Sequence, residues 1–244
     1  MGMIKKVVKR LLRSVGLDIV KHDNKTALEK LFTIFNKINF QPKYIIDVGA
    51  NRGLWTRRAL QYFPDANYTL LEPQVWLKDS VADLLEKNKK IKYYSVGAGE
   101  KEGKFKFTIT EHDVSSSFIY SEEEAVKLGL KQIDVPVITL NNLVNGNEIP
   151  DIIKVDAEGL DIEVLKGASN FLGKTEVIFM EAGVVSKQFK NDMLETLNFM
   201  DKNGYRLFEL TDFNRPPNGD VLWLLELAFV KKNGIIDSYP FEYK

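Results

Sequence analysis

Short apolar runs alternate along the chain with stretches in which apolar residues recur every three or four positions. The short runs predict strands at residues 44–48, 68–71, 91–96, 152–155 and 177–180. The longer periodic stretches predict helices at residues 54–63, 75–88, 161–171 and 191–203. Strands that alternate with helices are typical of an α/β protein, in which helices cover both faces of a mostly parallel sheet.

Two regions depart from this alternation. Residues 205–210 and 221–230 predict strands with no helix between them, so we expect this C-terminal pair to be antiparallel. An insertion between the third and fourth strands has strand patterns at 104–109 and 135–140 and a helical pattern at 122–128. Its polar connection contains Ser116, and we interpret residues 104–140 as a flap over a ligand-binding crevice.

The first 40 residues predict a helical appendage to one domain formed by residues 41–244. Up to residue 16, apolar residues at helical spacing share the segment with lysines and arginines. The simplest interpretation is a helix packed on the body, and the alternative is peripheral contact with an anionic membrane. Thr26 and Glu29 form a capping-box pattern that predicts a second helix, which covers the sheet.

Composition narrows the classes of function. The 34 lysines and arginines balance 34 acidic residues, so no overall field attracts nucleic acid, and we expect no nucleic-acid partner. The absence of cysteine excludes disulfides and thiolate nucleophiles and fits a reducing compartment. No signal peptide or membrane span is predicted, so we expect a cytoplasmic protein, at the inner face of the membrane if its first helix binds lipid. No pattern reveals an oligomeric state.

The most informative segment is YIIDVGANRGLWT, residues 44–56, in which an apolar strand ends in an acid and enters a turn with two glycines. A strand, a tight turn and a helix N-terminus together form a nucleotide-binding crevice, where Gly49 and Gly53 let a ligand approach the backbone. Asn51 stands where a dinucleotide fingerprint has its middle glycine, and its side chain obstructs a pyrophosphate but can bond an amino acid carboxylate. Asp47 would repel phosphates and attract an ammonium group.

These features favour S-adenosylmethionine, which carries an amino acid group and no phosphate. Glu72 ends the next strand, nineteen residues past Gly53, where an acid can accept hydrogen bonds from two ribose hydroxyls. Because such an acid suits both cofactors, an NAD-dependent oxidoreductase stays as an alternative. A crevice that binds nothing is the third interpretation.

A second dense motif, DIIKVDAEGLDIEVLKGA, spans residues 151–168. Strand periodicity places Lys154 and Asp156 on one face, and Asp156 and Glu158 at the strand's carboxyl end. The next strand ends in Glu181. Three carboxyl groups beside a lysine would shift one another's pKa values and supply a general base, or they could hold Mg²⁺ or Ca²⁺. The sequence does not choose between these roles, and no metal site is predicted.

Asp156 is the first candidate for the base or acceptor anchor, Glu181 the second, and His112 in the flap the third. Asp161 and Glu163 follow in the first turn of the next helix. We interpret these two only as charges that complement the positive end of that helix.

Residues that the cofactor does not need are candidates to contact a second substrate. Ser116 and His112 lie in the flap, and Asp212, Asn214 and Arg215 lie between the last two predicted strands. If strand 205–210 runs parallel to the first five, that loop rises at the same edge of the sheet as the cofactor.

The segments DVGANRG, LEP, VGAGEKEG and KVDAEGLDIEVLKGA occur in this order and resemble the FkbM family of S-adenosylmethionine-dependent methyltransferases. The resemblance implies a Rossmann-like class I methyltransferase fold, with a seven-stranded, mostly parallel sheet and an antiparallel C-terminal strand. It also implies O-methylation, often of a sugar hydroxyl in a glycan, glycolipid or natural product, so that the expected partner is a carbohydrate or small-molecule acceptor.

The same resemblance assigns functions to residues of the two motifs. The cofactor contacts that it implies are Asp47, Gly49, Asn51, Gly53 and Glu72, with Val96 and Gly97 near the adenine. The reaction-side set that it implies is Lys154, Asp156, Glu158 and Glu181. Gly97-Ala98 stands where members commonly have alanine-leucine. The competing hypothesis from another class is a membrane-associated binding protein that keeps the fold without turnover, motivated by the basic N-terminal segment.

Overall fold

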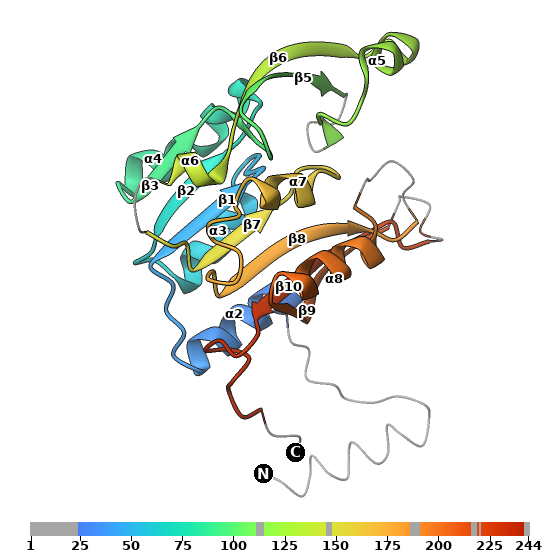
Figure 1. Cartoon of the computed structure of the whole chain (residues 1–244). Helices are drawn as coiled ribbons and strands as arrows, with labels where there is room; N and C mark the ends of the chain where they lie inside the picture. The colour runs from blue at the N-terminus through green and yellow to red at the C-terminus, as the bar shows by residue number, and fades with distance from the viewer. Residues whose placement is uncertain are drawn as a thin grey trace, which may run out of the picture.

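The computed structural model describes residues 24–110, 115–144, 148–185, 191–215, 219 and 221–241. A seven-stranded sheet with the order β3-β2-β1-β7-β8-β10-β9 forms its centre (Figure 1). The parallel strands are β1 (Tyr44–Val48), β2 (Asn67–Leu71), β3 (Ile91–Tyr94), β7 (Ile152–Val155) and β8 (Val177–Gly183). β10 (Leu224–Lys231) is antiparallel to both β8 and β9 (Tyr205–Asn214). This confirms the predicted Rossmann-like class I methyltransferase fold.

The strand order reverses at β1, which lies between β2 and β7. In an open α/β sheet, the loops after the strands diverge at such a point and leave a crevice beyond the carboxyl ends of the strands. The two sequence motifs leave β1 and β7, so both enter this crevice.

The helices follow the predicted alternation with two corrections. α2 (Ala27–Lys37), α3 (Leu54–Tyr62) and α8 (Met193–Lys202) lie where the periodicity places them. The helix predicted at 75–88 is instead a 3₁₀ segment η1 (Val75–Val81) followed by α4 (Ala82–Lys87). The break occurs where the Ser80 carbonyl accepts a hydrogen bond from Arg57 of α3 at 2.9 Å.

The helix predicted at 161–171 is shorter than expected. α7 (Asp161–Lys166) ends at Gly167, where a Cβ would lie 2.0 Å from the Gly99 carbonyl oxygen. The chain turns at this close contact instead of extending the helix.

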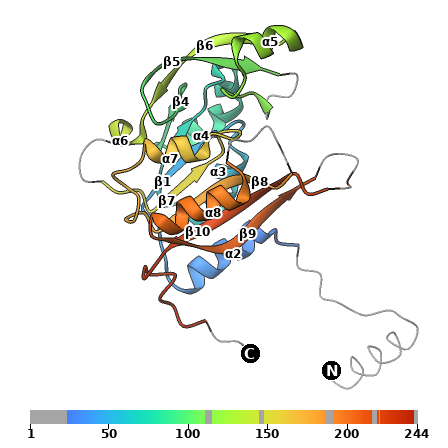
Figure 2. The same cartoon turned by 45° about the vertical axis from the view of Figure 1, so that its right-hand side comes forward.

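Two apolar layers cover the sheet. On one face, Phe32 of α2 and Trp55 of α3 pack with Phe179 of β8. On the other face, Leu165 of α7 and Met200 of α8 belong to the second core cluster. Figure 2 shows α8 and α2 on opposite sides of the β9–β10 pair. The Thr26–Glu29 capping box that starts α2 is present, as the sequence predicts.

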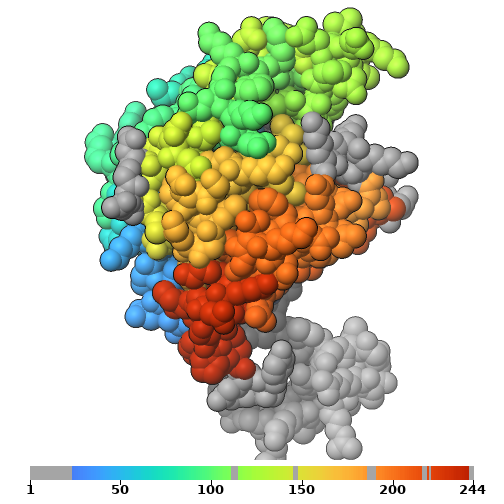
Figure 3. Space-filling model, in the orientation of Figure 1, coloured from blue at the N-terminus to red at the C-terminus, as the bar shows by residue number. Residues whose placement is uncertain are grey.

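The insertion forms a second sheet. β4 (Gly97–Ala98), β5 (Gly103–Ile109) and β6 (Lys131–Ile138) have the order β4-β6-β5, and α5 (Glu122–Leu128) and α6 (Leu140–Leu143) flank β6 in the chain. β6 starts earlier than the predicted 135–140 because the whole of β5 pairs with it in antiparallel register. Figure 3 shows this insertion, in green, as a layer over one end of the molecule.

The basic segment up to residue 16 lies outside the described residues, as does His112. Within the part of the chain that the structure describes, no helix is both long and apolar enough to cross a membrane.

Candidate active site

The glycine turn packs β1 directly against the end of β7. Gly49 and Gly53 have φ angles of +70° and +71°, and Asn51 adopts a left-handed conformation at +46°. A Cβ at Gly49 would lie 2.0 Å from the backbone oxygen of Asp156, so only glycine permits this approach. The Asn51 Oδ1 accepts a hydrogen bond from the Arg52 N–H at 2.8 Å, and such local bonds help asparagine to tolerate positive φ.

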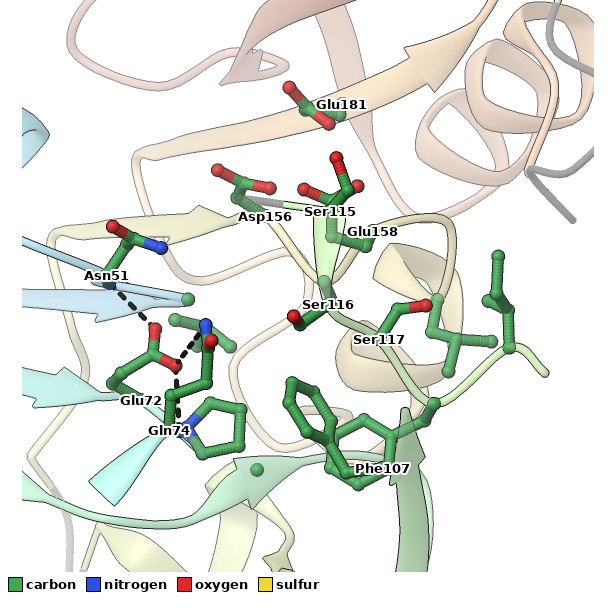
Figure 4. Close-up of a pocket in the computed structure, with 18 of the residues that line it drawn as sticks. Asn51, Glu72, Gln74, Phe107, Ser115, Ser116, Ser117, Asp156, Glu158 and Glu181 are labelled. Atoms are coloured by element: carbon green, nitrogen blue, oxygen red, sulfur yellow. Dashed lines mark hydrogen bonds between the residues drawn. The ribbon is translucent and has the colours of Figure 1, made fainter. Parts of the chain in front are cut away.

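A cavity of about 480 Å³ opens at this edge of the sheet (Figure 4). Its walls come from the glycine turn and the end of β2, from the loops after β7 and β8, and from the insertion. Five of the predicted cofactor contacts line it, namely Gly49, Asn51, Glu72, Val96 and Gly97. Asp47 and Gly53 are not among the described lining residues: Gly53 precedes α3, and Asp47 is fully buried in β1.

Glu72 joins the end of β2 to the glycine turn. Its Oε2 accepts the Asn51 N–H at 2.8 Å, and its Oε1 accepts the Gln74 N–H at 2.9 Å and the Gln74 side-chain amide at 3.2 Å (Figure 4). Burial raises the pKa of Glu72, and the hydrogen bonds from Gln74 and Asn51 oppose this rise. A carboxylate has about four acceptor sites, so Glu72 keeps capacity for a hydroxyl donor from a ligand.

Lys154 lies behind the cavity wall, among the ends of β1 and β7. Its Nζ is 3.3 Å from Asp47 Oδ1 and 3.2 Å from Asp156 Oδ2, and it donates to the Gly49 carbonyl at 3.0 Å. Burial works to lower the pKa of Lys154, but the charges of Asp156 and Asp47 outweigh burial and raise it. Lys154 is therefore a cation that holds the glycine turn and orients Asp156.

Asp47 has a structural environment in β1. It lies opposite Lys154 in the parallel register of β1 and β7, and its Oδ2 accepts the Thr56 hydroxyl at 2.5 Å. Both of its oxygens thus point toward groups of the protein, and it reaches the cavity only through Lys154.

Asp156, Glu158 and Glu181 are brought together on one wall of the cavity, which we call the acid wall (Figure 4). Glu158 has a φ of +50° and is followed by Gly159 at +94°, so the loop after β7 is tightly turned. Burial, together with Asp156 and Asp161, raises the pKa of Glu158 to about 9. Burial and the charges of Asp156 and Glu158 likewise raise the pKa of Glu181 well above its usual range.

Two further acids behind this wall were not predicted as parts of the site. Asp161 is fully buried, and its Oδ1 accepts the Glu181 N–H at 3.1 Å. Burial and Asp156 raise the pKa of Asp161 to about 8. Its interpretation as a charge that merely complements a helix end is therefore wrong, because it is a buried group that supports Glu181. Glu163 lies in the first turn of α7, and its Oε1 is 3.8 Å from the Nζ of Lys166 in the same helix.

The second acid that was not predicted is Glu226 of β10. It lies directly opposite Glu181 in the antiparallel register, and its Oε1 accepts the Thr211 hydroxyl at 2.5 Å. Burial raises the pKa of Glu226 to about 7, although the bond from Thr211 opposes the rise. The signal in the sequence was its interruption of the apolar run 221–230, but only the pairing register shows what it faces.

The candidate acceptor residues divide between the cavity and its surroundings. Ser116 and Asn214 line the cavity, and the Ser116 Oγ accepts the Thr110 N–H at 3.1 Å. Asp212 and Arg215 are exposed and are not among the described lining residues. The lining residues that sequence reasoning missed include Phe107, Ser117, Phe118 and Trp223.

The acidic and basic side chains that line the cavity all belong to the acidic class. They are Glu72, Asp156, Glu158 and Glu181, and no lysine, arginine or histidine joins them among the described residues. In the same part of the chain, no group of three or more histidine, cysteine or acidic residues is arranged to hold a metal ion.

Proteins of similar architecture are methyltransferases with low sequence identity. They include a precorrin-6y C5,15-methyltransferase from Geobacter metallireducens, at 13% identity and a TM-score of 0.45, covering 87% of this chain and 92% of that one. A 1,6-didemethyltoxoflavin-N1-methyltransferase from Burkholderia thailandensis, with bound S-adenosylhomocysteine, has 12% identity and a TM-score of 0.47, covering 94% and 87%. The N-methyltransferase NodS from Bradyrhizobium japonicum has 7% identity and a TM-score of 0.46, covering 86% and 99%.

The sequence comparison is more specific. No curated protein is significantly similar to the chain in sequence. Residues 47–207, which are more than half of the chain and include most of the first motif and all of the second, match the methyltransferase FkbM domain. The chain therefore belongs to the FkbM methyltransferase family.

Proposed function

We propose that the protein is an S-adenosylmethionine-dependent O-methyltransferase that methylates a sugar hydroxyl of a glycan, glycolipid or natural product. The observation that carries the cofactor assignment is that the described charged side chains of the cavity are all acidic. S-adenosylmethionine has a sulfonium and an ammonium group, whereas a dinucleotide has a diphosphate. Asp156, which is ion-paired with Lys154, attracts the first, and no basic side chain among the described lining residues could pair with the second, so the same observation opposes an NAD-dependent oxidoreductase.

The residues present fit this cofactor. Gly49 has no Cβ, and Asn51 offers a side chain that would bond the amino acid carboxylate. Glu72 would accept the ribose hydroxyls with the acceptor sites that its bonds to the turn leave open. Gly97 and Phe118 would bound the adenine from the insertion side.

When bound, S-adenosylmethionine supplies a methyl group on a sulfonium, which is a good leaving group. The chain's own task is to hold the acceptor oxygen in line with that methyl group and to take its proton. Placement of this kind contributes about 7–11 kcal/mol, whereas a general base contributes about 10²- to 10⁴-fold. We therefore expect the walls of the cavity to matter more than any single acid.

Asp156 is the base that this geometry favours. It is ion-paired with Lys154 at 3.2 Å, and an ion-paired carboxylate carries the negative charge that a base requires. Glu158, whose pKa is raised to about 9 by burial, is protonated at neutral pH and can donate a hydrogen bond to the acceptor. The two neighbouring acids thus have complementary roles.

Calorimetric titration tests the cofactor assignment. We expect the full chain to bind S-adenosylhomocysteine and not NAD. Glu72→Gln should weaken this binding about tenfold. The glutamine amide has only one acceptor oxygen, so it cannot replace both carboxylate oxygens of Glu72 as hydrogen-bond acceptors. Asp79→Asn, an exposed acid of η1, is the matched control and should bind as the wild type does. Heat on mixing with NAD but none with S-adenosylhomocysteine would contradict the proposal.

The non-catalytic alternative and the membrane contact have separate tests. Any methylated product formed from labelled S-adenosylmethionine excludes a protein without turnover. Flotation with anionic liposomes, of the full chain and of a chain that lacks residues 1–16, tests whether the basic segment binds lipid. If both forms float to the same extent, the basic segment does not make that contact.

A further inference from the structure

The acid wall contains an oxygen that no group of the described chain satisfies. The Oε2 of Glu181 is buried from solvent and has no hydrogen-bond partner among the described residues. Glu181 lines the cavity, and its own N–H is used by Asp161. A buried acceptor without a donor is costly, so a ligand that brings a donor to this oxygen gains affinity.

A second polar atom in the same cavity is also unsatisfied. Ser117 is only 2% exposed and lines the cavity, and its Oγ has no partner among the described residues. It comes from the insertion, whereas Glu181 comes from β8, so two independent parts of the fold supply unmet hydrogen-bonding groups. Figure 4 shows Ser115 beside Glu158, with Ser116 and Ser117 farther from Glu181.

Charge distinguishes between possible donors. Glu181 lies opposite Glu226 across the β8–β10 pair, and burial together with the neighbouring acids raises the pKa of both carboxyl groups, so the pair disfavours two full negative charges. The cation nearest to the wall, Lys154, is already in contact with Asp47 and Asp156. A cation from outside would stabilise the ionised form of Glu181, whereas an anion would find no positive side chain among the described lining residues.

We infer that the methyl acceptor carries a protonated amine near its reacting hydroxyl, as an amino sugar or aminocyclitol does, and that Glu181 and Ser117 receive this amine. An ammonium group supplies three hydrogen-bond donors and a positive charge. A hydroxyl group supplies one donor and carries no charge. Phosphorylated and uronic acid acceptors would find no basic side chain among the described lining residues. This inference rests on the proposed function, since it describes the acceptor of that reaction.

The test uses three sugars that differ in charge. Glucosamine, glucose and glucuronate are titrated into the full chain saturated with S-adenosylhomocysteine, and binding is followed by calorimetry or saturation-transfer NMR. We expect glucosamine to bind about tenfold more tightly than glucose, and glucuronate to bind least. Glu181→Gln should reduce the preference for glucosamine to about threefold or less, and Ser117→Ala should reduce it in the same direction.

Controls separate this inference from the proposed function. Glu195→Gln, an exposed acid of α8, should keep the full preference. The affinity of Glu181→Gln for S-adenosylhomocysteine is measured first, so that its sugar titrations are made with this compound bound. If S-adenosylhomocysteine does not bind to the wild type, the proposed function fails. If it binds, the inference is overturned when glucose or glucuronate binds as tightly as glucosamine, when Glu181→Gln keeps the preference, or when none of the three sugars binds.

Discussion

The ring of Phe118 lies against Gly97 so closely that a side chain could not fit between them. A Cβ at Gly97 would come 2.7 Å from the Phe118 Cζ and 3.2 Å from the Val137 Cγ2. Phe118 also packs edge to face on Phe107, with ring centroids 4.8 Å apart. Gly97 is therefore the position at which the insertion closes on the cavity, and this contact accounts for the glycine there.

Gly97→Ala should force the Phe118 ring away from β4. We expect a loss of about 1–3 kcal/mol in the free energy of unfolding and weaker binding of S-adenosylhomocysteine. Because the clash requires both residues, Gly97→Ala combined with Phe118→Ala should cost less than the sum of the single changes. Urea denaturation of the four proteins measures this coupling, and additive losses would show that the ring does not cause the restriction.

Three glycines separate the effect of backbone strain from that of a clash. Gly129 has a φ of +67° with nothing within 4 Å of a Cβ, whereas at Gly167, where no positive φ occurs, a Cβ would meet the Gly99 carbonyl oxygen at 2.0 Å. Gly49 combines a φ of +70° with a contact of 2.0 Å to the Asp156 oxygen. Gly129→Ala should cost about 1–2 kcal/mol, and Gly49→Ala should cost the most of the three. Equal denaturation midpoints for the Gly49 and Gly129 variants would contradict the close approach of the turn to β7.

The glycine turn could be predicted because its requirements are local. Positive φ angles at Gly49 and Gly53 follow from a tight turn between a strand and a helix, and the residues of that turn are contiguous. The same holds for β1 and β7, whose apolar runs are fully buried. Local pattern therefore predicted most of the sheet and the cofactor side of the cavity.

The rest of the site depends on contacts between distant segments. Glu226 belongs to the acid cluster only because β10 pairs antiparallel with β8 in a register that places it opposite Glu181. Asp161 looks like an ordinary first-turn acid until the packing of α7 on the sheet buries it. Phe118 contacts Gly97 only because the insertion folds over the cavity. The alternation of apolar and polar residues predicts the strands of this insertion but not where they lie relative to the main sheet. Register and docking are tertiary properties that a single sequence does not encode locally.

Lys154→Met should be strongly destabilising. It would leave Asp47, which is fully buried, without its cation, and removing one partner of a buried pair costs about 3–5 kcal/mol. Adding Asp47→Asn should recover part of this loss, since the uncompensated charge disappears. Lys166→Met, which breaks a half-exposed contact with Glu163 at 3.8 Å, is the control and should change the free energy of unfolding by less than about 0.5 kcal/mol. If Lys154→Met and Lys166→Met lowered the free energy of unfolding by similar amounts, the result would argue against the buried pair.

The acids near the cavity should make the protein less stable as pH rises. In the unfolded chain their pKa values lie near 4, whereas burial raises those of Glu158, Asp161 and Glu226 to about 9, 8 and 7 in the folded protein. Between these limits the folded protein binds more protons than the unfolded chain. The free energy of unfolding therefore falls as pH increases from about 5 to about 9, by about 1.4 kcal/mol per pH unit for each extra proton held.

Asp161→Asn isolates one contribution to this slope. The new amide would imitate the protonated acid and could still accept the Glu181 N–H, so the variant should lose less stability than the wild type between pH 6 and 9. Asp83→Asn serves as the control, because the hydrogen bond from Arg57 lowers the pKa of Asp83 to about 2, and a lowered pKa affects stability only in acid. The measurement is the unfolding midpoint across this pH range. Parallel curves for the wild type and Asp161→Asn would mean that Asp161 is ionised in the folded protein, which would require a cation beside its buried carboxylate.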